Sequence, residues 1–534
     1  MRSLFNTVTL ASGDTTHAMD TGRAEHFLQN KRAFWIVGVL AIILFLVTNL
    51  PWQLDDYDQA KQAFTSFEMV KEGHWFYQQT PHERVATKPP LVGWTSAVFF
   101  ALTRSWNVAW RLPSFLAAIA LSILLLRVAS SAYGSIAGLI ALSAFGFNLL
   151  SPRLATLART DMPLALVIFL LGLFIWKKIR HRETWNLPDR LSIFALLTAA
   201  MLIKGPIIYA FLLPGIVLFQ LWGRRRHACH HSAWCGWWPW FASLGIFLLW
   251  VIGGVLFVPG FFDQVVVREF VARFGEAVHR PQPFYFYLPH LLHKFAPWSV
   301  LMIATAIVDL RSRDSKLRAL FREMSPETFW LVCWTFGGLI AMSLIPSKRV
   351  DRIFPVVPPL CLLLAAQVAR RQSRDFLASP AERPIHPTSR SDDLSWHNDG
   401  VRGRIYRWTA AALLFSILFT SGYTVAKVVS GYRDHRDALV VFGREVCHEA
   451  ALRHWRYEAI SGSDEGMLLY LQKTHFIKPE KAIREWNRGA LDALVAPAEE
   501  GPRLLRELQN ASLSPLRPVE RKNQRGKSYV LLTR

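Results

Sequence analysis

Three charged side chains stand at the ends of apolar segments, where they could take part in chemistry at a membrane surface. Asp58 follows the first apolar segment, Asp161 begins the fourth, and Lys204 opens a Lys-Gly-Pro corner after the fifth. A carboxylate can orient or deprotonate a hydroxyl group, and an ammonium group can stabilise developing negative charge. We predict that the three share one cavity; solvated interface charges are the alternative.

Further candidates lie in loops that combine cations with aromatic rings. One loop ends in the aromatic run Phe284-Tyr285-Phe286-Tyr287. Arginine binds phosphate oxygens with its fork of donors, and aromatic rings settle at headgroup depth, so these loops fit a phosphate carried on a lipid tail. An aromatic belt with ordinary anchors is the alternative. The candidates are Lys88, Glu269, His279, Arg280, Lys348 and Arg349, with Asp55 and Asp56 as second candidates for the acid.

The elements that must position these residues are membrane helices. The chain has 534 residues, of which 52% are hydrophobic, and its mean hydropathy of +0.21 is too high for a soluble protein of this size. A helix needs about 20 apolar residues to cross a hydrocarbon core of about 30 Å. We therefore predict an α-helical polytopic membrane protein with about eleven spans. They are residues 34–50, 112–129, 135–150, 162–176, 191–203, 206–222, 237–258, 288–308, 329–345, 353–369 and 408–429.

The formal net charge of +22 follows from basic clusters between these spans. Cytoplasmic loops collect Lys and Arg, and with a cytoplasmic N-terminus every cluster falls inside. No cluster is interleaved with rings in the pattern of a single-strand-binding platform, so the charge does not indicate nucleic acid. The expected organisation is a cytoplasmic tail over residues 1–33, a transmembrane domain over 34–429, and an extracytoplasmic α/β domain over 430–534.

Two segments outside the spans are expected to be juxtamembrane helices. Phe64, Phe67 and Met69 recur at nearly helical spacing among charged residues, which predicts a helix lying flat in the interface. Residues 91–102 are apolar but too short to cross. At the far end, Tyr529-Val530-Leu531-Leu532 is typical of a strand.

The cysteines and histidines of one loop could imitate a metal site. They are His227, Cys229, His230, His231 and Cys235. Their spacing matches no standard zinc pattern, and they follow three consecutive arginines. An ordinary basic cytoplasmic loop is the favoured interpretation, and we predict no metal ligands.

Taken together, the motifs resemble those of integral-membrane glycosyltransferases of the GT-C class, in particular the aminoarabinose-transferase and protein O-mannosyltransferase-like group. The resemblance covers roughly residues 34–369. The motifs are Asp58 with the segment after it, Lys88-Pro89-Pro90, Arg111-Leu112-Pro113, Thr160-Asp161-Met162-Pro163, Lys204-Gly205-Pro206, His279-Arg280, Ala296-Pro297-Trp298 and Ser347-Lys348-Arg349.

This resemblance implies transfer of a sugar from a polyprenyl-phosphate donor to an acceptor (lipid, glycan or protein) at the outer face of a bacterial inner membrane, with inversion. Asp58 matches the first-loop acid, which would position or deprotonate the acceptor. Lys88 matches the Lys-Pro lysine of the class and Lys204 its Lys-Gly lysine, and both, with Arg280, would bind phosphate. Asp161 would hold a lysine or the sugar.

The chain departs from the pattern of its relatives in three places. Gln59 and Thr87 stand where relatives usually have acids, and Phe270 stands where some have histidine. Since the last two positions are associated with a bound metal in the aminoarabinose branch, no metal cofactor is expected. A transporter or flippase of lipid-linked sugars is the alternative function; it would also need a cationic cavity between spans.

Overall fold

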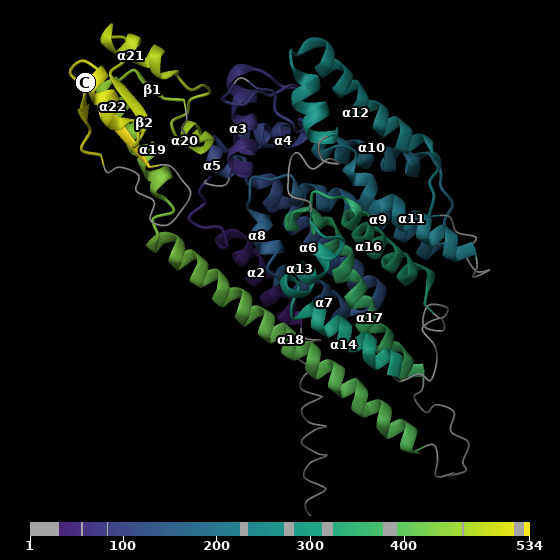
Figure 1. The fold of residues 1–534 in the computed structure, drawn as a ribbon. Helices are drawn as coiled ribbons and strands as arrows, with labels where there is room; N and C mark the ends of the chain where they lie inside the picture. The colour runs from purple at the N-terminus through teal and green to yellow at the C-terminus, as the bar shows by residue number, and fades with distance from the viewer. Residues whose placement is uncertain are drawn as a thin grey trace, which may run out of the picture.

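The structure is a computed structural model in which helices dominate. It describes residues 31–54, 57–82, 84–224, 233–271, 282–311, 324–377, 392–461, 464–516 and 528–534. Figure 1 shows a helical bundle with α18 (Asp392–Arg433) running along one side and the C-terminal residues gathered at one end. We call residues 438–534 the C-terminal unit.

Helices occupy the positions of all the predicted spans. Within the described residues, six helical segments are long and apolar enough to cross a membrane, or up to seven if one bent pair counts as a single span. Others are shorter apolar helices, so the number of spans stays a prediction. The helices are α2 (Lys31–Val47), α6 (Leu112–Tyr133), α7 (Ser135–Gly146), α9 (Asp161–His181), α10 (Leu187–Lys204), α11 (Tyr209–Arg224), α12 (Trp238–Phe257), α13 (Tyr287–Lys294), α14 (Trp298–Arg311), α16 (Pro326–Leu344), α17 (Val357–Leu377) and α18.

The bundle is held together by apolar side chains and by close backbone contacts. Its core is a continuous cluster of buried Ala, Leu, Ile and aromatic residues from these helices. α11 and α16 meet at Gly215 and Gly337, where a Cβ atom on Gly337 would lie 2.6 Å from the Gly215 nitrogen. Small residues let membrane helices approach in this way, so a larger residue at either glycine would separate the pair.

The predicted span over residues 288–308 is wrong as a single helix. It is divided into α13 and α14, which meet at an angle of 100°. Pro297 stands at the break, where it has no N–H group to continue the hydrogen bonding of α13. Because the whole segment is apolar, its composition gave no sign of the bend.

The two helices predicted between the first and second spans are present: α3 (Tyr57–Glu72) and α4 (Leu91–Thr103). The apolar side of α3, which was predicted to rest on lipid in the interface, is instead buried in protein. Phe64 and Phe67 pack with residues of the C-terminal unit such as Leu439 and Met467. The spacing of apolar residues predicted which side of α3 is apolar. It could not predict that the C-terminal unit covers that side.

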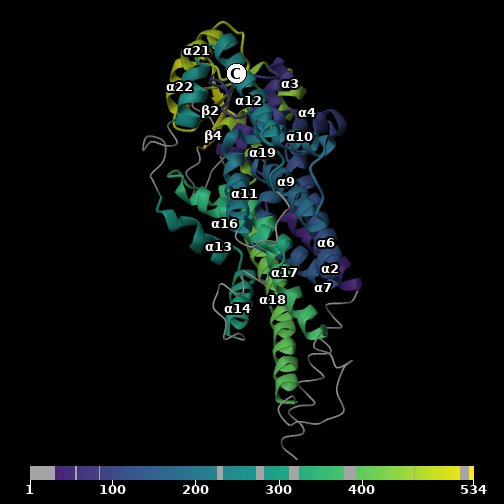
Figure 2. The ribbon, with the colours of Figure 1, turned by 90° about the vertical axis from the view of Figure 1, so that its right-hand side faces the viewer.

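The C-terminal unit contains a four-stranded sheet with helices around it. The strand order is β1 (Tyr457–Ala459), β2 (Ala493–Pro497), β4 (Tyr529–Thr533), β3 (Ser512–Leu513); β1 and β2 are parallel and the other pairs antiparallel. β4 confirms the predicted strand. Its helices are α19 (Ala438–Arg453), α20 (Glu465–Tyr470), α21 (Pro479–Asn487) and α22 (Gly501–Glu507). In the turned view of Figure 2 the unit caps the end of the molecule next to α3 and α4.

Candidate functional site

A cavity of about 220 Å³ lies where α3, α9, α10 and η4 (Val350–Val356) meet. Asp58, Asp161 and Lys204 all line it, so the three residues singled out by the sequence do converge. Seven lysine and arginine side chains and three aspartates line this cavity, which we call the aspartate cavity. They are Lys61, Lys88, Arg159, Lys204, Arg268, Arg349, Arg352, Asp58, Asp161 and Asp351.

Helix ends deliver the charges to this cavity. Asp58, Asp161 and Asp351 each lie in the first turn of a helix, α3, α9 and η4 respectively. A carboxylate there interacts favourably with the positive end of the helix dipole. Lys204 ends α10, where a cation interacts favourably with the negative end. The sequence thus places these four charges where their own helices stabilise them.

Asp161, which is buried, forms an ion pair with Lys204, whose side chain is 10% exposed, between α9 and α10. Gly205 follows Lys204 with φ of +76°, a conformation that costs a glycine little, and Pro206 begins the next helical segment. This turn fixes the end of α10 and therefore the lysine. Burying a charge without a partner is costly, so each residue of the pair depends on the other.

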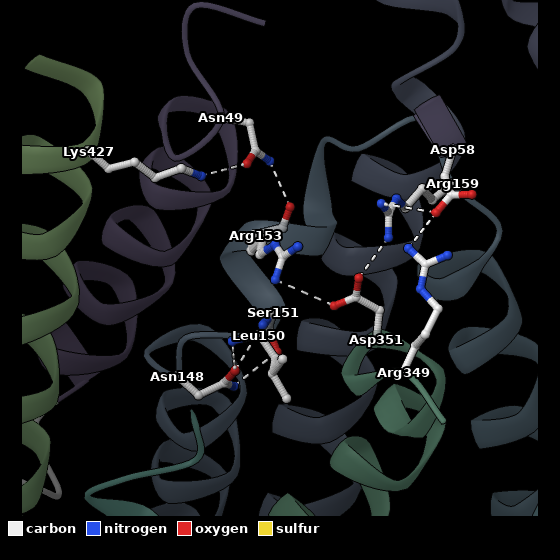
Figure 3. Close-up of polar contacts among 10 residues, drawn as sticks. All are labelled: Asn49, Asp58, Asn148, Leu150, Ser151, Arg153, Arg159, Arg349, Asp351 and Lys427. Atoms are coloured by element: carbon white, nitrogen blue, oxygen red, sulfur yellow. Dashed lines mark hydrogen bonds and ion pairs between the residues drawn. The ribbon is translucent and has the colours of Figure 1, made fainter. Parts of the chain in front are cut away.

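Asp58 belongs to a second set of ion pairs (Figure 3). Its carboxylate pairs with Arg349 and lies 3.6 Å from Arg159. Arg159 also donates to Asp351 Oδ2 at 2.7 Å, and Arg153 lies 3.6 Å from the other oxygen of Asp351. A chain of alternating charges therefore connects α3, the segment before α9, and η4.

These contacts decide the protonation of Asp58. Burial favours its neutral form, but the hydrogen bond from Arg349 and the charges of Arg349, Arg159 and Lys88 outweigh burial and lower the pKa of the carboxyl group. Asp58 is therefore a carboxylate at neutral pH. It is better suited to orient a hydroxyl group and accept its proton late in a reaction than to act as a strong base.

The other predicted residues divide into three groups. Lys88 and Arg349 line the aspartate cavity. Lys348 does not line it; its ammonium group donates to the backbone oxygen of Gln282 at 2.9 Å. The side chains of Asp55, Asp56, Glu269, His279 and Arg280 lie outside the part of the chain whose side chains the structure describes.

Several cavity residues were not assigned by sequence reasoning. Arg159 lies two positions before Asp161, and Asp351 belongs to the same cationic segment as Arg349, so both adjoin recognised motifs. Lys61 follows Asp58 by three positions and lies on the same face of α3. The proximity of Arg159 to Asp351 depends on tertiary structure, which no local pattern reveals.

The described residues contain no group of three His, Cys, Asp or Glu side chains arranged to hold a metal ion. Of the histidine and cysteine run considered from the sequence, Cys235 is described and buried, and residues 227–231 lie outside the described ranges.

Comparison with known proteins confirms the predicted resemblance to the GT-C class of membrane glycosyltransferases, of the aminoarabinose-transferase type. The family model described as dolichyl-phosphate-mannose-protein mannosyltransferase matches residues 87–253. That stretch begins next to Lys88 and contains Asp161 and Lys204.

Among individual proteins, the chain is similar to undecaprenyl phosphate-alpha-4-amino-4-deoxy-L-arabinose arabinosyl transferases. It is 26% identical to transferase 1 of Sodalis glossinidius over 64% of this chain, and 26% identical to the Shewanella sediminis protein over 62%. These matches span 60% and 58% of the relatives' own lengths. The crystal structure of ArnT from Cupriavidus metallidurans bound to undecaprenyl phosphate has the same fold, with a TM-score of 0.65 at 18% identity, covering 94% of this chain and 98% of that one.

Proposed function

We propose that the protein transfers a sugar from a polyprenyl-phosphate donor to an acceptor hydroxyl or phosphate, with inversion at the anomeric carbon. The observation that carries the proposal is the aspartate cavity, in which cations outnumber carboxylates beside the ends of α9 and α10. An excess of positive charge at this position suits a phosphate whose lipid tail lies in the bilayer. The names of the similar proteins support the same class of donor.

The reaction breaks the bond between the anomeric carbon and a phosphate oxygen, and that oxygen keeps the electron pair. Lys88, Lys204 and Arg349 are placed to stabilise the resulting charge on the phosphate. The acceptor oxygen forms its bond to the anomeric carbon from the opposite side, which inverts the configuration. Asp58 orients a hydroxyl acceptor and receives its proton, and Asp161 keeps Lys204 in position.

The proposal includes an orientation in a bacterial inner membrane. Residues 1–33 are cytoplasmic, residues 34–429 make up the transmembrane domain, and residues 430–534 are an extracytoplasmic α/β domain. Two arguments support this arrangement: alternating spans would place the basic clusters on one side, and α3, which lines the aspartate cavity, packs against the C-terminal unit. The donor would then be used on the outer face.

An in vitro transfer assay with radiolabelled undecaprenyl-phosphate sugars tests the proposal, beginning with 4-amino-4-deoxy-L-arabinose, the sugar named for the relatives. The wild-type protein should form labelled product, and Asp58→Asn should lower turnover by at least about 100-fold. Asp434→Asn, an aspartate at the outer end of α18, is the matched control. Flipping of the donor without transfer would instead identify a transporter.

A further inference from the structure

A second cavity, of about 320 Å³, lies between the C-terminal unit and residues 51–111, which we call the first outer loop; Asp58 and Lys204 do not line it. We call it the tryptophan cavity. Three cations line it, and none of the described residues that line it is acidic. Its lining residues are Lys71, Phe100, Arg104, Ser105, Trp106, Asn107, Trp110, Arg444, Leu469, Tyr470 and Gln472.

The cations of this cavity come from three separate elements. Lys71 is in the last turn of α3, Arg104 caps the end of α4, and Arg444 is on α19. Among the described residues, none of these three side chains makes an ion pair with an acid. Three like charges around one small space repel each other, and an anion would relieve that repulsion.

Aromatic rings form one wall of the cavity. Phe100 and Trp106 stack with their ring centroids 4.0 Å apart and 11° between their planes, and Trp110 continues the stack at 6.0 Å. Trp106 belongs to α5 (Trp106–Ala109), the short helix that turns the chain from α4 into α6. Such a wall offers apolar contact to the carbon atoms of a ligand whose anionic group meets the cations.

The surroundings of the cavity indicate where its ligand comes from. Val98 and Leu102, one turn apart on α4, are 59% and 74% exposed, whereas Val92 and Ala97 of the same helix are buried. Two large exposed aliphatic side chains on an apolar helix beside a membrane bundle are expected to face lipid. The exposed side of α4 is therefore next to the cavity that Phe100 and Arg104 of the same helix line.

We propose that the tryptophan cavity binds the phosphate of an anionic lipid headgroup, with Lys71, Arg104 and Arg444 on the phosphate oxygens and the Phe100–Trp106–Trp110 stack against the headgroup carbons. A lipid bound there touches α3, α4 and α19 at once, so it joins the first outer loop to the C-terminal unit. This proposal is independent of the transfer reaction.

Native mass spectrometry of the purified full chain tests the proposal, with phosphatidylglycerol and phosphatidylcholine offered at equal concentration. The wild-type protein should retain phosphatidylglycerol preferentially, and Lys71→Gln/Arg104→Gln/Arg444→Gln should bind it about tenfold or more weakly. The control Lys478→Gln/Arg484→Gln/Arg488→Gln removes three exposed cations at α21 and should bind like the wild type. Equal retention of both lipids, or unchanged binding in the triple cavity variant, would overturn the proposal.

Two further measurements complete the test. Arg104→Gln alone should weaken phosphatidylglycerol binding several-fold. Because Arg104 is exposed, this variant tests the proposal even if the triple variant does not fold. Inorganic phosphate and glycerol 3-phosphate should compete poorly with the intact lipid. If either one displaces phosphatidylglycerol at a similar concentration, the cavity is a free-phosphate site and the lipid assignment is wrong.

Discussion

The two cavities differ in how their charges are balanced. In the aspartate cavity, the carboxylates are ion-paired: Asp161 with Lys204, and Asp58 and Asp351 with arginines. In the tryptophan cavity, cations face one another beside aromatic rings and no lining acid is described. Paired charges hold side chains in fixed positions, as bond making requires, whereas unbalanced cations suit simple retention of an anion.

One helix takes part in both cavities. Asp58, Lys61 and Thr65 of α3 line the aspartate cavity, and Lys71 at the end of the same helix lines the tryptophan cavity. The remaining side of α3 is covered by the C-terminal unit, and Thr474 of that unit donates to Glu72 at 2.6 Å. The C-terminal unit thus supports the position of Asp58, although Asp58 belongs to the first outer loop.

Breaking the Asp161–Lys204 pair of the aspartate cavity should affect transfer about as strongly as Asp58→Asn. Lys204→Met removes the proposed phosphate contact and leaves Asp161 without its ion pair, so kcat/KM should fall roughly 100-fold, equivalent to about 3 kcal/mol. Lys204→Met/Asp161→Asn should be more stable than Lys204→Met, because no charge is left buried alone, yet equally inactive. Transfer rates and thermal unfolding of both variants check this. A fully active double variant would remove Lys204 from the mechanism.

A smaller effect is expected at Asp351, which accepts from Arg159 beneath Asp58. Asp351→Asn keeps the shape of the side chain but removes the charge that pairs with Arg159, so stability should fall by about 3 kcal/mol. Arg159 would then pair with Asp58 alone, and transfer should fall about tenfold. Thermal unfolding and transfer, measured on the same preparation, separate the effect on stability from the effect on transfer. Unchanged stability would show that the Arg159–Asp351 pair contributes little to folding.

Glu465 offers a test that depends on pH. It is 6% exposed on α20, and burial raises its pKa to about 7, an effect that Asp464 adds to and Lys61 opposes. The folded state therefore binds this proton more tightly than the unfolded state, whose ordinary pKa is 4.5. Its contribution to stability is complete below pH 4.5 and is lost as pH rises through 7.

Glu465→Gln should consequently gain stability relative to the wild type between pH 5 and pH 8, by no more than about 3 kcal/mol. Thermal unfolding of both proteins across this range measures the difference. α20 also supplies Tyr470 to the tryptophan cavity. The same measurement therefore reports on the stability of a helix that lines this cavity. If the stabilities of the two proteins changed with pH in the same way, the raised pKa of Glu465 would be contradicted.

The smallest effect on transfer is expected for Lys348→Met. Lys348 donates to the backbone oxygen of Gln282 and does not line the aspartate cavity, so we expect its charge to contribute little to binding of the donor phosphate. Transfer should stay within about threefold of the wild type, with Lys204→Met as the comparison. A loss as large as that of Lys204→Met would mean that the cavity extends to Lys348.

Sequence patterns could predict the positions of charged residues that stand at the ends of helices. Alternation of the spans predicted that Asp58, Asp161 and Lys204 lie on one side, and the structure brings them into one cavity. Periodicity likewise predicted α3. The pairing of Arg159 with Asp351, 192 residues apart, could not be predicted, because it depends on how η4 packs against α9.

The corner between α13 and α14 and the tryptophan cavity could not be predicted from composition. An uninterrupted apolar run predicted one helix where α13 and α14 form a corner at Pro297. The tryptophan cavity combines Arg104 of the first outer loop with Arg444 of α19, and each cation alone is an ordinary surface residue. Only the fold places them around one space.

The most direct test of the central claim is a structure of the full chain with undecaprenyl phosphate bound. The phosphate should lie in the aspartate cavity, within about 3 Å of donors from Lys88, Lys204 or Arg349. A phosphate held elsewhere, with none of these side chains in contact, would contradict the assignment of this cavity as the site of transfer.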